Sequence, residues 1–148
     1  MANLDIRPAA PNEVTTVVRL YNLMWTGAPL DLKMGKRFFE RVKNSPDHDL
    51  YVATSDDRVV GVFSLLIEKM DPPGRRCQVQ LDNVAVHPRY RGQGIGRAII
   101  GFVKKRCREA GCDRVLHGTR PGQADASGFY QSLGFEREGR YLVLKLEG

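Results

Sequence analysis

The spacing of apolar residues divides the chain into short strands and amphipathic helices. Apolar positions recur at helical spacing after Pro11 and again after Pro29, whereas short apolar runs bounded by turn residues mark the strands. The pattern predicts strands at 4–8, 49–55, 58–68, 79–86, 114–118, 135–138 and 141–146. It predicts helices at 11–24, 30–44, 94–110 and 123–132.

This order of elements, β-α-α-β-β-β-α-β-α-β-β, predicts an α/β (α+β) fold in a single domain, residues 1–148. The strands at 79–86 and 114–118 flank a helix, so we expect them to be parallel neighbours. The hairpin at 49–68 implies antiparallel pairs as well. The prediction is therefore a mixed central sheet of about seven strands with helices on both faces.

The strand at 79–86 departs from simple alternation. Val84 and Val86 share a face, but Leu81 and Val84 cannot share one if side chains alternate strictly. Either this strand is buried on both faces, or a bulge shifts its alternation between residues 81 and 84.

Composition gives an uneven distribution of charge. The chain has 148 residues and a net charge of +6. Residues 69–120 hold twelve Lys and Arg against four acids, a net of +8, so the remainder sums to −2. This charge fits an anionic ligand or, equally, a solvated basic face.

The other residue classes exclude several functions. The three cysteines form no CxxC pair and cannot all be paired within one chain, so we expect no disulfide framework and a cytoplasmic protein. The three histidines lack metal-site spacing, and no metal is predicted. No apolar stretch approaches the length of a membrane span, and residues 1–13 do not have the pattern of a secretory signal.

The loop between the strand at 79–86 and the following helix is rich in glycine. It reads Arg91-Gly92-Gln93-Gly94-Ile95-Gly96. The N–H groups at a helix start and the helix dipole favour an anion, and glycines let phosphate oxygens approach the backbone. The loop is not a P-loop, and its GxGxG spacing disfavours a dinucleotide site.

A second motif lies further along, where residues 129–135 read Phe-Tyr-Gln-Ser-Leu-Gly-Phe. With Arg91, Gly94 and Gly96, this FYxxLGF motif resembles the GNAT superfamily of acetyl-CoA-dependent N-acyltransferases. The resemblance is most specific over residues 79–135 and extends to the order of elements. It implies acetyl transfer from acetyl-CoA, as the donor substrate, to an amine.

The resemblance also implies where acetyl-CoA binds. Residues 91–96 would hold its pyrophosphate, and the strand 84–86 would bond its pantetheine arm as an added strand. Gln123 stands where the family often has Asn, which leaves that contact open. The predicted donor-binding residues are Val84, Ala85, Val86, Arg91, Gly92, Gln93, Gly94, Ile95, Gly96, Arg97, Gln123 and Phe129.

Attack of an amine on a thioester requires a base, an oxyanion donor and support for the leaving thiolate. By resemblance, Tyr130 would lie near the sulfur and the Val84 N–H would stabilise the oxyanion. The resemblance also implies a bulge in the strand at 79–86, and Asp82, just before it, matches an acidic residue of several small-amine members that often acts through water. Asp82 is therefore the first candidate base. His117, at the end of the strand at 114–118, is the second and has an ordinary pKa better suited to the task. Tyr130 in a packing role and Asp82 paired with an arginine remain the alternatives.

The acceptor is the least specified part of the prediction. Trp25, Arg75 and Arg76 lie on segments that contact the acceptor in such folds, and the arginines favour an amine carrying phosphate or phosphonate. We therefore expect a small-molecule amine, as in aminosugar-phosphate and aminoalkylphosphonate acetyltransferases. A peptide or protein amine and a non-catalytic acyl-CoA sensor are the alternatives. No nucleic-acid or membrane partner is expected, and a homodimer is left open.

Overall fold

The computed structural model describes residues 3–25, 27–69, 77–118, 127–138 and 144–145. The strands within these ranges are β1 (Leu4–Pro8), β2 (His48–Ser55), β3 (Arg58–Lys69), β4 (Cys77–Val86) and β5 (Arg114–Leu116). The helices are α1 (Val14–Met24), α2 (Leu32–Lys43), α3 (Ile95–Glu109) and α4 (Ser127–Ser132), with 3-10 turns at η1 (Pro11–Glu13) and η2 (Pro88–Tyr90).

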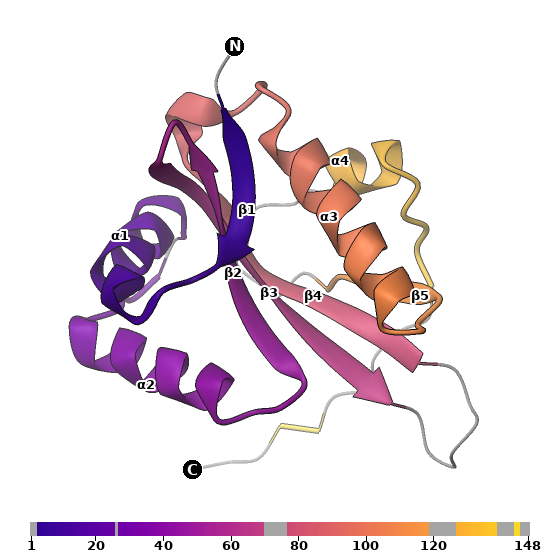
Figure 1. Cartoon of the computed structure of the whole chain (residues 1–148), viewed down its shortest axis with the longest axis horizontal. Coiled ribbons are helices and arrows are strands. Elements are labelled where there is room, and N and C mark those ends of the chain that lie inside the picture. The colour runs from indigo at the N-terminus through magenta and orange to yellow at the C-terminus, as the bar shows by residue number, and fades with distance from the viewer. Residues whose placement is uncertain (1–2, 26, 70–76, 119–126, 139–143, 146–148) are drawn as a thin grey trace.

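The five described strands form one mixed sheet in the order β1-β2-β3-β4-β5. Adjacent strands are antiparallel from β1 to β4, whereas β4 and β5 are parallel and α3 connects them. The prediction that these two strands are parallel neighbours is confirmed. Figure 1 shows α1 and α2 on one side of the sheet and α3 and α4 on the other.

Alternating side chains of the sheet build a separate core on each face. The core under α3 and α4 includes Phe63, Leu81 and Ile99, each at most 1% exposed. The core under α1 and α2 includes Val52 and Val62, both fully buried. A side chain on one face of the sheet therefore packs against α1 and α2, and a side chain on the other face packs against α3 and α4.

A β-bulge interrupts the pairing of β3 with β4. Val62 pairs with Ala85 and Ser64 with Asp82, so one residue of β3, Phe63, lies opposite both Asn83 and Val84. Asn83 adopts a positive φ of 56°. The extra residue puts Leu81 and Val84 against the same core, under α3 and α4. Of the two explanations for the irregular alternation, the bulge is the one confirmed.

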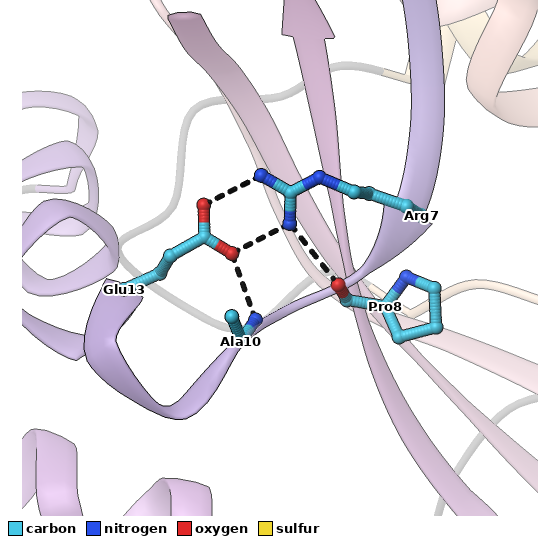
Figure 2. Close-up of polar contacts among 4 residues, drawn as sticks. All are labelled: Arg7, Pro8, Ala10 and Glu13. Atoms are coloured by element: carbon cyan, nitrogen blue, oxygen red, sulfur yellow. Dashed lines mark hydrogen bonds and ion pairs between the residues drawn. The ribbon is translucent and has the colours of Figure 1, made fainter. Parts of the chain in front are cut away.

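A cluster of charged groups fixes the start of the first helical segment. The Glu13 carboxylate accepts hydrogen bonds from both terminal nitrogens of Arg7, at 2.6 and 2.8 Å, and from the Ala10 N–H at 2.7 Å (Figure 2). The Arg7 guanidinium also donates to the Pro8 carbonyl. Because the Arg7 hydrogen bonds stabilise the ionised carboxylate, the pKa of Glu13 is lowered. The contact ties the end of β1 to the segment that leads into α1.

The last two predicted strands are not confirmed. Phe135–Glu138 carry no strand assignment and pair with none of the described strands, although Glu138 bonds Arg114 of β5. The partner expected at 141–146 lies mostly outside the described residues. The structure thus shows a sheet of five described strands, and the expected total of about seven is not confirmed.

The cysteine prediction also needs correction, because a disulfide joins Cys77 to Cys112. Cys77 begins β4 and Cys112 precedes β5, and the parallel pairing of these strands brings the two Cα atoms to 4.5 Å. Cys107 is buried and unpaired with another cysteine. Since one pair does form, the cysteine count no longer supports a reducing compartment.

Candidate functional site

The short strand β5 pairs in parallel with only the first part of β4. The hydrogen-bonded register covers Gln78–Gln80 against Arg114–Leu116, whereas β4 continues to Val86. Among the described strands, none pairs with residues 82–86 along the edge that faces β5. A strand edge of this kind offers backbone groups to an extended ligand. The predicted donor-binding residues Val84, Ala85 and Val86 all lie on this segment.

Hydrogen bonds from neighbouring elements hold the bulged backbone of β4. The buried Tyr21 hydroxyl of α1 donates to the Asn83 carbonyl at 2.8 Å. The Asn83 side-chain amide donates to the Ser64 hydroxyl, which in turn donates to the Asp82 carbonyl. These three bonds fix residues 82–83, immediately before the Val84 N–H that is the predicted oxyanion donor.

The glycine loop follows β4 directly and ends in the N-terminus of α3. Gly92 and Gly94 have φ of 75° and 84°, in the left-handed region that favours glycine. Gly94 is the N-cap of α3 and, having no side chain, makes no side-chain capping hydrogen bond. Arg91, Gln93 and Arg97 are all exposed along the loop and first turn. The loop and first turn thus combine the N–H groups of a helix start with two exposed cationic residues, features that favour an anion.

Gly96 leaves room for the ring of Phe129, a contact that the glycine spacing of the loop did not indicate. A Cβ at this position would lie 2.6 Å from the Cζ atom of Phe129. The Phe129 ring, 43% exposed, therefore rests directly on the first turn of α3. The contact joins the two motifs that were recognised separately in the sequence and places α4 beside the loop.

The rings of Tyr130 and His117 contact each other in a tilted arrangement beside the split between β4 and β5. Their ring centroids are 4.1 Å apart with an interplanar angle of 30°. Tyr130 is buried in the core under α3, and this burial raises its pKa to about 12. The phenol is therefore protonated and able to donate a hydrogen bond at neutral pH. The structure brings together these two predicted catalytic residues.

The position of His117 also determines where its ring proton lies. Its Nδ1 atom donates to the Leu81 carbonyl at 2.9 Å, since a carbonyl oxygen only accepts. In the neutral ring this leaves the lone pair on Nε2. The contact bridges β4 and β5 at the point where their pairing ends, so His117 both spans the split and presents a basic nitrogen there.

Asp82 lies on the opposite face of the sheet from Tyr130. It pairs in register with Ser64, and cross-strand partners share a face. Ser64 is two residues from Val62, which belongs to the core under α1 and α2. The structure thus places the two candidate bases apart, with Asp82 on the α1–α2 face and His117 beside Tyr130.

The α1–α2 face contains a cavity of about 190 Å³, and Asn83 is one of its lining residues. Trp25, a predicted acceptor contact, lines this cavity and stacks on Tyr21 at 4.1 Å. Sequence reasoning did not identify Tyr21 or Asn83 as site residues. The i, i+4 spacing of Tyr21 and Trp25 on one helix was the available signal, but it is equally typical of core packing.

Three predicted contacts, Arg75, Arg76 and Gln123, lie outside the described residues. Within the part of the chain that is described, no group of three or more His, Cys, Asp or Glu is arranged to hold a metal ion. Over the same residues, no helix combines the length and apolar character needed to cross a membrane.

Comparison with known proteins gives matches along most of the chain. Residues 15–135 match the model of the acetyltransferase (GNAT) family. N-acetyltransferase family 8 member 2 of Rattus norvegicus is 38% identical over 93 residues, which are 63% of this chain and 41% of that protein. The chain thus spans about two fifths of the length of that relative.

Solved structures agree over nearly the whole chain. An acetyltransferase of Trypanosoma brucei superposes with a TM-score of 0.78 at 25% identity, covering 97% of this chain and 100% of the other. An aminoglycoside N-acetyltransferase in complex with CoA superposes with a TM-score of 0.81 at 20% identity, covering 100% of this chain and 97% of the other. At that identity the second match speaks for the fold alone.

Proposed function

Because the chain belongs to the acetyltransferase (GNAT) family, we propose that it transfers an acetyl group from acetyl-CoA to the primary amine of a small molecule, by direct attack in a ternary complex. The observation that carries this proposal is the edge of β4 that no described strand pairs, which leads into the glycine loop and has the His117–Tyr130 pair beside it. The strand edge suits an extended ligand arm, the glycine loop suits its phosphates, and the buried phenol suits its thioester sulfur. Together these features match the chemistry of acetyl-CoA.

The donor would lie along the edge of β4. Backbone groups of residues 84–86 would bond its amide-containing arm, and the N–H groups of the glycine loop would take its pyrophosphate. The exposed side chains of Arg91 and Arg97 add positive charge at the same end. The Val84 N–H, next to the fixed carbonyl of Asn83, would receive the developing oxyanion.

Tyr130 would act on the leaving sulfur. With a pKa of about 12, its phenol is a weaker acid than a thiol, whose ordinary pKa is about 8.5. Complete transfer of the phenolic proton to the thiolate is therefore uphill. We assign Tyr130 the role of a hydrogen-bond donor that stabilises negative charge as it develops on sulfur.

The amine must lose a proton before it attacks. We rank Asp82 first as the base, acting through water, because it lies on the face that carries the cavity. His117 Nε2 is the second candidate. The pH profiles of two variants distinguish the candidates. If Asp82 is the base, Asp82→Asn should abolish the fall of kcat/KM at acid pH and His117→Asn should keep it. If His117 is the base, the two variants should behave the other way round.

The proposal is tested by thiol release from acetyl-CoA with a panel of primary amines. We expect release with at least one small amine. We expect Tyr130→Phe to lower kcat by about 10- to 100-fold while the dissociation constant of CoA changes little. Tight CoA binding without thiol release for any amine would instead identify an acyl-CoA sensor. Release with peptide amines alone would move the acceptor to that class.

A further inference from the structure

The cavity between α1 and α2 has a lining of one chemical kind. Its volume is about 190 Å³, and it is lined by Val17, Val18, Tyr21, Trp25, Leu30, Met34, Gly35, Phe38, Phe39 and Asn83. None of these lining residues, all within the described part of the chain, carries a charge. Four of them are aromatic. The cavity thus offers apolar contact over most of its surface.

The two lining residues with polar side chains, Tyr21 and Asn83, already make hydrogen bonds within the protein. The Tyr21 hydroxyl donates to the Asn83 carbonyl, and the Asn83 amide donates to Ser64. A polar or ionised group entering the cavity would lose its hydration and gain few hydrogen bonds in return. The lining therefore selects for apolar groups and against phosphate or phosphonate.

The volume sets the size of the group that fits. An apolar protein cavity of about 150 Å³ is large enough to bind benzene. At about 190 Å³ this cavity accommodates a phenyl ring, a cyclohexyl ring or a branched aliphatic group. It is too small for several side chains of a peptide at once.

The cavity also lies next to the reacting atoms of the proposed function. Asn83, one of its lining residues, directly precedes Val84. Asp82, the first candidate base, lies on the same face of the sheet. A short primary amine whose apolar group fills the cavity would therefore bring its nitrogen close to the bulge, which carries the candidate base and the predicted oxyanion donor.

From this juxtaposition we propose that the α1–α2 cavity is the acceptor subsite and that the acceptor is a primary amine carrying an apolar group about the size of a phenyl ring. This assignment rests on the proposed acetyl transfer. It replaces the anionic acceptor suggested by Arg75 and Arg76 with an apolar one.

Binding can be measured without turnover, because Trp25 lines the cavity and is the single tryptophan of the chain. Phenethylamine and 2-cyclohexylethylamine, added to the protein saturated with CoA, should change the Trp25 emission in a saturable manner. The anionic amine 2-aminoethylphosphonate should leave it unchanged over the same range. A saturable response to the phosphonate and none to the apolar amines would overturn the proposal.

A pair of variants on α2 locates the effect. Phe38→Ala removes part of the lining and should weaken phenethylamine binding about tenfold, the loss expected for one aromatic contact. Leu32→Ala is the matched control, because Leu32 is exposed on the same helix and does not line the cavity. Both variants retain Trp25 as reporter. Equal affinity in the two variants would place the apolar group elsewhere.

Turnover by the unmodified protein gives a test that needs no variant. Across linear amines from ethylamine to hexylamine, kcat/KM should rise about fourfold per methylene until the cavity is filled. Thiol release without this rise refutes the apolar subsite and leaves the acetyltransferase proposal standing. Saturable Trp25 binding without thiol release from any amine refutes the transferase and keeps an apolar ligand site.

Discussion

The contact between Gly96 and Phe129 gives a sharp test of how the glycine loop and α4 are joined. Gly96→Ala would put a Cβ 2.6 Å from Phe129 Cζ, with the next ring atoms at 3.3 and 3.4 Å. Because carbon atoms pack at about 3.5–4.0 Å, the ring must move by about 1 Å. Tyr130 follows Phe129 directly on α4, and their ring centroids are 5.3 Å apart. Displacing Phe129 should therefore also displace the proposed hydrogen-bond donor.

Gly101→Ala is the matched control on the same helix. A Cβ at Gly101 meets no atom within 4 Å, so only the helix propensity changes there. Replacing glycine by alanine inside a helix stabilises a protein by about 0.5–1 kcal/mol, or about 2–4 °C in Tm. The difference between the two variants isolates the steric contact, because both alanines gain a similar propensity.

For Gly96→Ala we expect little or no gain in Tm and a kcat about 10- to 100-fold below that of Gly101→Ala. Thermal melting and thiol release on the purified variants measure both quantities. Gly96→Ala combined with Phe129→Leu should recover part of kcat, because leucine lacks the ring atoms that clash. If Gly96→Ala matches Gly101→Ala in both Tm and kcat, Phe129 does not rest on α3 in the active protein.

Three further predictions follow from the hydrogen bonds around α1 and the bulge. Tyr21→Phe should lower the free energy of unfolding by about 1–3 kcal/mol in urea denaturation, because the Asn83 carbonyl loses its buried donor. Asn83→Gly relieves the positive φ and should retain more stability than Asn83→Ala; equal stabilities would contradict a strained backbone. Glu13→Gln should cost about 1 kcal/mol at pH 7. Since the pKa of Glu13 is lowered in the fold, this difference should persist above its ordinary pKa and vanish as the pH falls through the lowered value.

The elements that local spacing encodes were predicted well. The strand at 4–8 and the hairpin at 49–68 agree with β1, β2 and β3 to within one residue at each end. The irregular alternation between Leu81 and Val84 located an irregularity that either a bulge or burial on both faces would explain, and the structure has the bulge. These features depend on neighbours within a few residues, which is the range over which a sequence pattern is informative.

Contacts between distant segments account for what the sequence did not reveal. The Cys77–Cys112 pair forms because of the parallel register of β4 and β5, and this register cannot be inferred from the number of cysteines. The need for glycine at Gly96 comes from a ring 33 positions away on another helix. The glycine spacing was thus recognised correctly, but only two of its three glycines have positive φ.

The bulge in β4 links these observations to the proposed chemistry. Without the extra residue, Asp82 and Val84 would point to the same face of the sheet. With it, Asp82 faces α1 and α2, where the cavity lies, and Val84 packs toward α3, where Tyr130 is buried. One inserted residue therefore separates the side from which we expect the amine to arrive from the side on which the thiolate would depart. In direct attack the amine approaches over one face of the thioester carbonyl, whereas the sulfur lies in the carbonyl plane, so the two groups need different space around the acetyl carbon. The bulged strand would supply that separation within its own backbone.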